Sequence, residues 1–164
     1  MQIIPFAAEY REPLLALSLR AWEQVFPLLE PAVSSFVYES FYPRGWRERQ
    51  SEDLAVTLDD EPENVDIVLV DGELAGWVCT RIHPEDHMGE VYVLAIDPEH
   101  QGKGLGRALL QHSIERARSH GMRMVMVETG DDPGHAPARH LYETSGFERW
   151  PVARYFKDIS HESQ

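Results

Sequence analysis

Cysteine, basic residues and long apolar runs are all scarce in this sequence. Its 164 residues include a single cysteine, Cys79, which excludes an internal disulfide and is typical of a reducing compartment. No apolar run approaches the length needed to cross a bilayer, and no basic and apolar leader opens the chain. We therefore expect a cytoplasmic protein with no membrane anchor.

The shortage of positive charge argues against nucleic-acid binding. With 28 acidic residues against 15 basic ones, the formal net charge is −13. Proteins that bind nucleic acid need a dense basic surface, so we expect no nucleic-acid partner. Acidity of this size also keeps a protein soluble, and it would attract a cationic partner. The length suits one domain covering residues 1–164.

The most informative stretch of the chain follows an apolar run rich in β-branched residues. Val91 to Ile96 predicts a strand buried on both faces, and it ends at Asp97-Pro98. A glycine-rich loop comes next, and then a helix that Gly121 ends. The helix carries one apolar stripe, formed by Leu105, Leu109, Leu110, Ile114 and Ala117.

Three glycines therefore lie between a buried strand and the first turn of a helix. The first turn has N–H groups without intrahelical partners and carries the positive end of the helix dipole. Glycines have no Cβ atoms that would keep a phosphate at a distance, and Lys103 and Arg107 add positive charge. The loop predicts a site for a phosphorylated ligand.

The spacing of the glycines restricts the identity of that ligand. The dinucleotide fingerprint G-x-G-x-x-G fails in both registers, because Arg107 or Leu109 stands in place of the third glycine. A Walker loop fails because no serine or threonine follows Lys103. The remaining pattern, Q-x-x-G-x-G, resembles the pyrophosphate loop of the GNAT superfamily of N-acetyltransferases, which use acetyl-CoA. Its three defined positions are Gln101, Gly104 and Gly106.

A second segment, some 35 residues later, strengthens the resemblance. Residues 138–147, ARHLYETSGF, are similar to the family pattern A-x-x-L-Y-x-x-x-G-F, in which the helix lies beside the pantetheine arm. Two motifs in the right order and separation are more specific than either one alone. The sequence departs from the pattern at His135, where the family usually has an asparagine that contacts the cofactor.

The resemblance implies an α/β (α+β) fold with a single mixed, mostly antiparallel sheet. In that fold a central parallel pair of strands splays apart, helices flank the sheet, and the pantetheine enters the gap. The implied cofactor contacts are main-chain groups of Leu94, Ala95 and Ile96, the loop residues Gln101, Gly102, Lys103, Gly104, Leu105, Gly106 and Arg107, and also His135 and Ala138. No metal is implied.

Acyl transfer to an amine requires a neutral amine and a protonated leaving thiol. An ammonium group with a pKa of about 10.4 costs about 4.6 kcal/mol to deprotonate at pH 7, so a base is needed. Glu90 matches the catalytic glutamate of the family's histone acetyltransferase branch, and Glu128, which closes the neighbouring strand, is its rival. Tyr142 matches the tyrosine that approaches the thioester sulfur, and it can act as the general acid.

We therefore expect an acetyl-CoA-dependent N-acetyltransferase that acetylates a primary amine by direct attack on the thioester. The alternative is a non-catalytic CoA-binding or CoA-sensing module of the same fold. The acceptor stays open among a protein N-terminus, a lysine, a polyamine, an aminoglycoside and an amino acid, with a cationic amine favoured by the charge. Dimerisation is common in the family, so the choice between monomer and homodimer also stays open.

Hydrophobic periodicity and turn signals predict the remaining elements. Asp71-Gly72 is a strong hairpin signal between two apolar runs. The expected strands are 2–6, 65–70, 73–82, 122–127, 147–150 and 153–159. The expected helices are 9–26, 31–41 and 46–58, with a short one from Pro137 through Tyr142.

Overall fold

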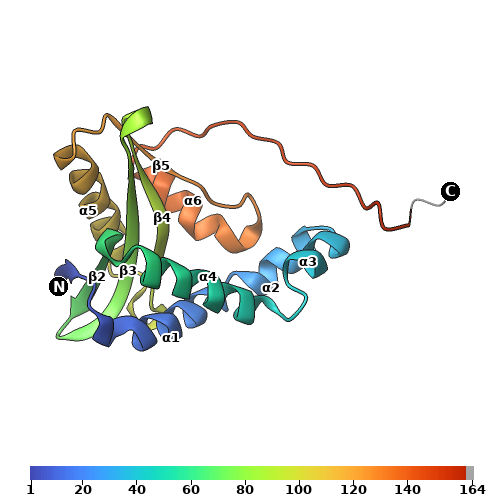
Figure 1. Ribbon diagram of the computed structural model, residues 1–164, viewed down its shortest axis with the longest axis horizontal. Coiled ribbons are helices and arrows are strands. Elements are labelled where there is room, and N and C mark those ends of the chain that lie inside the picture. The colour runs from blue at the N-terminus through green and yellow to red at the C-terminus, as the bar shows by residue number, and fades with distance from the viewer. Residues whose placement is uncertain (162–164) are drawn as a thin grey trace.

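A computed structural model describes residues 1–161. Its centre is a five-stranded sheet whose strands are arranged in chain order (Figure 1). These strands are β1 (Gln2–Pro5), β2 (Val65–Val70), β3 (Glu73–His83), β4 (Met88–Ile96) and β5 (Met124–Val127). β1 to β4 pair antiparallel, whereas β4 and β5 are parallel. The predicted mixed, mostly antiparallel sheet is confirmed. The parallel pair, which we expected at the centre, lies at one edge of the sheet because no strand follows β5.

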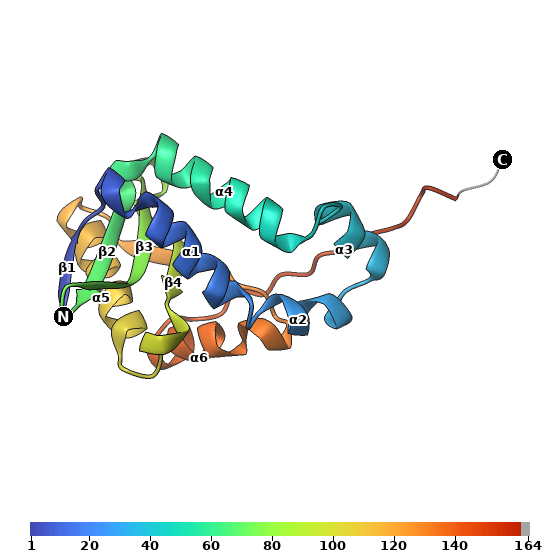
Figure 2. The same ribbon diagram turned by 90° about the horizontal axis from the view of Figure 1, so that it is seen from below.

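Helices cover both faces of the sheet. α1 (Arg11–Trp22) and α4 (Trp46–Asp60) pack on one face, and α5 (Leu105–Ser119) and α6 (Ala136–Thr144) on the other (Figure 2). Two short helices, α2 (Phe26–Leu29) and α3 (Ser35–Phe41), extend beyond the sheet. Trp77 is fully buried under α1, and its indole N–H donates to Ser18 Oγ at 2.8 Å.

The two β-hairpin strands lie where the sequence places them. Both turn residues have positive φ, 52° at Asp71 and 82° at Gly72, as a tight two-residue hairpin turn requires. The apolar stripe of α5 is also confirmed, because Leu105, Leu109, Leu110 and Ala117 are buried, with Ile114 packed at the edge of the same core. Local sequence signals are sufficient for these two elements.

One expected helix, residues 9–26, is in fact two. α1 ends at Trp22, and α2 begins at Phe26 with Pro27 in its first turn. Proline has no N–H and its ring clashes with the carbonyl four residues earlier, so it cannot stand inside the helix but fits the start of a new one. Pro31 acts in the same way, since it lies in a 3₁₀ turn and α3 starts only at Ser35.

β4 is not buried on both faces as predicted. Between residues 91 and 96 only Val91 and Ala95 are buried, and Tyr92 is 43% exposed. The reason is that β5 pairs with Met88 to Val91 alone and ends at Val127, while β4 continues to Ile96. The second half of β4 therefore borders an open space, and this is the splayed pair that the family fold implies.

The two predicted final strands, 147–150 and 153–159, are wrong. From Phe147 to Ile159 the chain has no strand, and it leaves the sheet in an extended path that reaches beyond α3 (Figures 1 and 2). The residues have side chains that favour strands, but β propensity expresses mainly how a side chain packs in an existing sheet. Because no neighbouring strand supplies backbone partners here, the segment does not form a strand.

Candidate functional site

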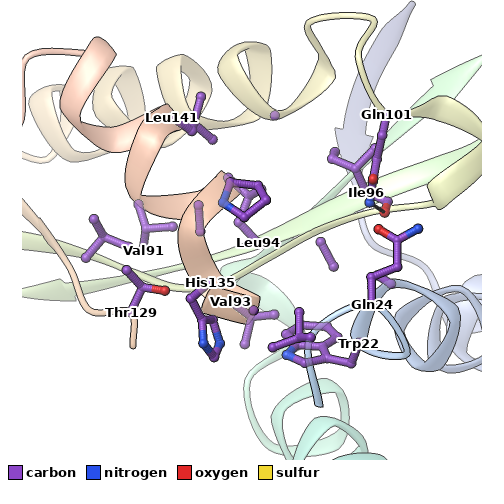
Figure 3. A pocket seen from close by; sticks show the side chains of 18 of the residues that line it. Trp22, Gln24, Val91, Val93, Leu94, Ile96, Gln101, Thr129, His135 and Leu141 are labelled. Atoms are coloured by element: carbon purple, nitrogen blue, oxygen red, sulfur yellow. Dashed lines mark hydrogen bonds between the residues drawn. The ribbon is translucent and has the colours of Figure 1, made fainter. Parts of the chain in front are cut away.

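A pocket of about 680 Å³ opens where β4 and β5 part. The helices α1, α4, α5 and α6 all contribute to its wall, so it lies between the two helical layers (Figure 3). Its lining from the sheet and the adjoining loops includes Val91 to Ile96, His100, Gln101, Gly102, Gly104, Val127, Glu128, Thr129 and His135. Eleven of the fourteen residues predicted from the sequence line this pocket: Leu94, Ala95, Ile96, Gln101, Gly102, Gly104, Leu105, Gly106, His135, Ala138 and Tyr142.

The wall from β4 is an unpaired strand edge. Ala95 pairs with Trp77 of β3 on one side, but β5 pairs with no residue of β4 beyond Val91. The register between β3 and β4 also shifts at Cys79/Thr80, which leaves Tyr92 as the extra residue of a bulge. Backbone N–H and C=O groups along such an edge are free to bond a ligand.

The glycine-rich loop closes the opposite end of this wall. Gly102 and Gly104 have φ of +75° and +80°, conformations that side chains rarely adopt, and no atom lies within 4 Å of a Cβ built on either residue. Gly104 caps α5 with no side-chain hydrogen bond, so the first-turn N–H groups have no capping side chain. Gln101 Nε2 donates to the Ile96 carbonyl at 3.3 Å and ties the loop to β4.

Two predicted loop residues, Lys103 and Arg107, do not line the pocket. The guanidinium of Arg107 instead donates to Thr144 Oγ1 at 3.0 Å and to Ser145 Oγ at 3.1 Å, at the end of α6. It therefore holds α5 against α6. The sequence pattern predicts the positive charge of Arg107 correctly, but it does not predict which way the side chain points. Successive residues of a helix point in different directions, so Gly106 lines the pocket while Arg107 points toward α6.

Tyr142 lines the pocket from α6. Burial raises the pKa of its phenol to about 12, so the group stays protonated throughout the physiological range. The ring packs near Phe147, with 6.0 Å between centroids. Within residues 1–161 its hydroxyl has no hydrogen-bond partner, so the proton is available to a ligand.

His135 lines the pocket, and a hydrogen bond to Asp132 fixes the orientation of its ring. Its Nδ1 lies 2.6 Å from Oδ1 of Asp132, whose side chain is only 7% exposed. Arg139 donates to the carbonyls of Gly130 and Asp132 at 2.7 and 2.6 Å and so holds the loop that carries this carboxylate. With Nδ1 bonded to Asp132, Nε2 is the nitrogen left for the pocket, which both His135 and Thr129 line (Figure 3).

The two candidate bases differ in their surroundings. Glu90 does not line the pocket; its Oε1 lies 2.8 Å from Nε2 of His83, and this hydrogen bond raises the pKa of His83. Glu128, at the end of β5, is exposed and lines the pocket. Of the two residues, only Glu128 lines the pocket.

The resemblance implies that helices near the N-terminus line the acceptor pocket, but we expect most of their aromatic side chains, Trp22 included, to be core, and the sequence selects no pocket residue of α1 or α4. Trp22 and Gln24 line this wall of the pocket from the end of α1, and Gln50, Asp53 and Thr57 from α4. No motif marks these residues. The available signal was helical spacing, since positions 50, 53 and 57 lie on one helix face.

An ion pair joins this wall to the end of the pocket next to the glycine-rich loop. Arg20 of α1 bonds Asp97, which follows β4 and is buried. Burial alone would raise the pKa of this carboxyl, but Arg20 and the backbone N–H of Glu99 outweigh it and hold the pKa low. Asp97 is therefore a charged anchor between α1 and the loop before α5.

Three other features could point to a function: the cysteine, metal-binding groups and membrane-spanning helices. Cys79 is fully buried in the sheet, and burial raises the pKa of its thiol, which argues against a nucleophile. The described residues contain no group of three or more His, Cys, Asp or Glu side chains that could hold a metal ion. Across residues 1–161, every helix is too short or too polar to span a bilayer.

Sequence comparison connects this pocket to known proteins. Residues 22–147 match the sequence profile of the acetyltransferase (GNAT) family. A mycothiol acetyltransferase of Thermomonospora curvata is 40% identical over 103 residues, which cover 63% of this chain and 32% of the relative. One of Kocuria rhizophila is 35% identical over 116 residues, covering 68% and 32%. The chain thus spans about a third of the length of these curated relatives.

Solved structures share the fold. The PaiA N-acetyltransferase of Thermoplasma acidophilum, in complex with coenzyme A, superposes with a TM-score of 0.66 at 16% identity, covering 93% of this chain and 92% of that one. The ribosomal-protein-S18-alanine N-acetyltransferase of Escherichia coli gives a TM-score of 0.63 at 22% identity, covering 96% and 84%.

Proposed function

This chain belongs to the acetyltransferase (GNAT) family, and we propose that it transfers an acetyl group from acetyl-CoA to a primary amine in the pocket between β4 and β5. The observation that carries this proposal is the meeting of an unpaired strand edge with an uncapped, glycine-rich helix start. The first can hydrogen-bond the amides of a pantetheine arm, and the second can receive a pyrophosphate.

The cosubstrate contacts follow from this arrangement. We propose that Leu94, Ala95 and Ile96 bind the pantetheine arm through their backbone, and that Gln101 to Gly106 surround the pyrophosphate. The open space at Gly102 and Gly104 supports this assignment, because no protein atom beyond the adjoining residues lies within 4 Å of a Cβ built on either glycine. Lys103 and Arg107 contribute positive charge at the rim rather than contacts inside the pocket.

We propose Glu128 as the group that accepts the proton of the acceptor amine. Glu128 lines the pocket, while Glu90 does not, and the carboxylate of Glu90 is bonded to His83. The assignment of Glu90 stays a prediction, and it requires His83 or a water molecule to relay the proton. A general base of this kind contributes about 10² to 10⁴ in rate.

Tyr142 is proposed as the acid that protonates the departing thiolate. Its raised pKa keeps the phenol protonated before the reaction, and no hydrogen bond within the described residues competes for its hydroxyl. Transfer of this proton to a thiolate, whose conjugate acid has a pKa of about 8.5, is uphill by about 5 kcal/mol, so it requires close positioning of the sulfur. The amine attacks the thioester carbon directly, the C–S bond breaks as the tetrahedral intermediate collapses, and sulfur takes the Tyr142 proton. Backbone N–H groups of the β4 edge stabilise the oxyanion.

The acceptor is proposed to be a small-molecule amine that carries positive charge. Asp53 and Glu128 place carboxylates on two walls of the pocket, and the whole chain has a net charge of −13. The curated relatives are named for an acetyltransfer reaction of a small molecule, mycothiol, which supports this class.

The deciding experiment measures thiol release from acetyl-CoA with a panel of amines: polyamines, aminoglycosides, amino sugars, amino acids and peptides. Calorimetry with CoA runs in parallel. Amine-dependent release by the wild-type chain, lost in a Glu128→Gln Tyr142→Phe double variant that still binds CoA, supports the enzyme. CoA binding with no release from any amine would identify the alternative, a CoA-binding module.

A further inference from the structure

The loop between β5 and α6 holds a carboxylate and an imidazole as a pair. Nδ1 of His135 lies 2.6 Å from Oδ1 of Asp132, and the side chain of Asp132 is only 7% exposed. The other carboxylate oxygen, Oδ2, is buried and has no hydrogen-bond partner within residues 1–161. A buried carboxylate charge is costly unless a neighbouring group balances it. A protonated imidazole at His135 supplies that balance.

Two glycines make room for this pair. A Cβ at Gly130 would overlap Oδ1 of Asp132 and lie 2.8 Å from Nδ1 of His135. A Cβ at Gly134 would overlap the carbonyl of Val25 and lie 3.0 Å from Oδ2 of Asp132. Neither glycine has a positive φ, so the backbone conformation does not require glycine at these positions. The requirement is for space, which means that the loop is shaped around the carboxylate and the imidazole.

The surroundings of the pair hold it in place and leave Nε2 of His135 for the pocket. Arg139 of α6 fixes the loop by donating to the carbonyls of Gly130 and Asp132 at 2.7 and 2.6 Å. α2 packs against the turn Pro133–His135 and has no charged side chain. The titratable groups that line the pocket together with His135 are Asp53, His100, Glu128 and Tyr142.

Acetylation of a cationic amine removes two protons from one nitrogen. The ammonium group loses the first proton before it can attack. The nitrogen loses the second proton after attack, when it carries a positive charge in the tetrahedral intermediate. One carboxylate holds one proton at a time, so Glu128 alone does not account for both. An imidazole exchanges protons near neutral pH, and a carboxylate bonded to Nδ1 orients the ring and stabilises the imidazolium.

We propose that Nε2 of His135 accepts this second proton, an assignment that rests on the proposed acetyl transfer. An N–H bond of the tetrahedral intermediate breaks and leaves its electron pair on nitrogen, while a new N–H bond forms at Nε2. The imidazolium then pairs with the carboxylate of Asp132. Collapse of the intermediate breaks the C–S bond, and sulfur takes the proton of Tyr142. Afterwards His135 gives one proton to water and Tyr142 regains one from water, so the protons balance.

The positions of the two proton-transfer groups on α6 fit these roles. His135 caps the start of α6, and Tyr142 follows seven residues later, about two helical turns along the same face. Both residues line the pocket. One helix thus presents a proton acceptor and a proton donor to the same space, one for the nitrogen and one for the sulfur of the tetrahedral intermediate.

His135→Asn separates proton transfer from cofactor binding, because an amide makes hydrogen bonds but does not accept a proton at neutral pH. At saturating acetyl-CoA its kcat should fall by about 10² or more, while calorimetry should give a CoA affinity within a few-fold of wild type. A wild-type kcat in this variant, with or without weaker CoA binding, overturns the assignment alone. A wild-type chain that releases no thiol with any amine overturns the proposed acetyl transfer together with the assignment.

The pH dependence distinguishes the role of His135 from that of Glu128. The deficit of Glu128→Gln should shrink as pH rises toward the pKa of the acceptor, because a neutral amine has already lost its first proton. The second proton becomes available only at attack, so the deficit of His135→Asn should persist over the same range. A deficit of His135→Asn that disappears in parallel with that of Glu128→Gln overturns the assignment to the second proton.

His112 supplies a matched control. Its Nε2 lies 2.9 Å from Oδ2 of Asp66, whose side chain is also 7% exposed, but neither residue lines the pocket. His112→Asn therefore breaks the same kind of pair outside the pocket, and kcat should stay at the wild-type value. An equal fall of kcat in His112→Asn and His135→Asn would show that turnover is lost through damage to the fold, and this result overturns the assignment.

Discussion

Nε2 of His83 lies 2.8 Å from Oε1 of Glu90, across the antiparallel pair β3 and β4. The carboxylate that sequence resemblance selects as the base is therefore already hydrogen-bonded, and its partner's pKa is raised by that bond. Glu128, on the far side of the pocket, has no such partner among the described residues and lines the open space. Replacing each of the two glutamates by glutamine therefore tests which of them is the base.

Glu128→Gln should lower kcat/KM by about 10² to 10⁴ at neutral pH, because an amide cannot accept the amine proton. The deficit should shrink as pH approaches the pKa of the acceptor, where the amine is already neutral. Steady-state rates between pH 6 and 10 measure this, with Glu90→Gln as the control. The opposite ranking of the two variants would restore Glu90 as the base.

Tyr142→Phe should reduce kcat by about 10² while the melting temperature and the affinity for CoA change little, because the lost interaction is made mainly in the transition state. Its raised pKa, about 12, adds a second readout. Burial opposes ionisation, so this tyrosine costs the fold stability as pH rises from about 10 toward 12, and the variant should lose that part of the decline. Normal turnover in the variant would make Tyr142 a packing residue.

Gly104 and Gly121 offer a matched test of the pyrophosphate site. They flank α5 with φ of +80° and +78°, and neither has an atom within 4 Å of a built Cβ. Valine at either position should therefore cause similar backbone strain and a similar loss of stability. Only Gly104→Val should weaken CoA binding in calorimetry, by about tenfold or more. Equal CoA affinity of the two variants would place the pyrophosphate elsewhere.

The variants His135→Asn and His135→Ala test whether His135 makes a hydrogen bond with CoA or only fills space in the pocket. Asparagine restores the residue that the family pattern has at this position, so it should keep CoA affinity within a few-fold, and alanine should lower it by about tenfold, the worth of one buried hydrogen bond. Asp132→Asn should weaken binding as well, because it removes the carboxylate that orients the imidazole. Unchanged affinity in all three variants would exclude His135 from the site.

Asp53→Asn should raise KM for a cationic acceptor several-fold and leave KM for acetyl-CoA unchanged, since it removes a negative charge from the acceptor wall. Glu52→Gln is the control: it removes the same charge one residue away, outside the pocket, where the side chain bonds Arg44. Added salt should lessen the effect of Asp53→Asn. Equal changes of KM in both variants would show that Asp53 acts only through the overall net charge and not through its place in the pocket.

The parts of the fold that follow from sequence are those set by local chemistry. The Asp71-Gly72 turn and the positive φ angles at Gly102 and Gly104 each need residues that tolerate left-handed backbone. The buried stripe of α5 needs only helical periodicity. The glycine-rich loop and the start of α5 line the pocket at the place where the sequence predicts cosubstrate contacts. That these residues bind acetyl-CoA stays a prediction.

The acceptor side could not be read in the same way. Trp22 and Asp53 come from helices that meet over the sheet, and their meeting depends on packing rather than on a nearby signal. The bond between His83 and Glu90 depends on the register of two strands. The expected final strands failed for a related reason: the side chains favour a strand, but whether one forms depends on a partner outside the segment.

The inner edge of β4, from Tyr92 to Ile96, has a consequence for solubility. Strand edges with free backbone groups invite pairing with other chains and so promote aggregation, and proteins normally cover them or place charges on them. Here the edge lines a pocket whose other walls come from α1, α4, α5 and α6, so helices stand on both sides of the free backbone groups. The helices on both sides thus hinder a second chain from pairing with this edge, which lowers the tendency to aggregate that a free strand edge carries.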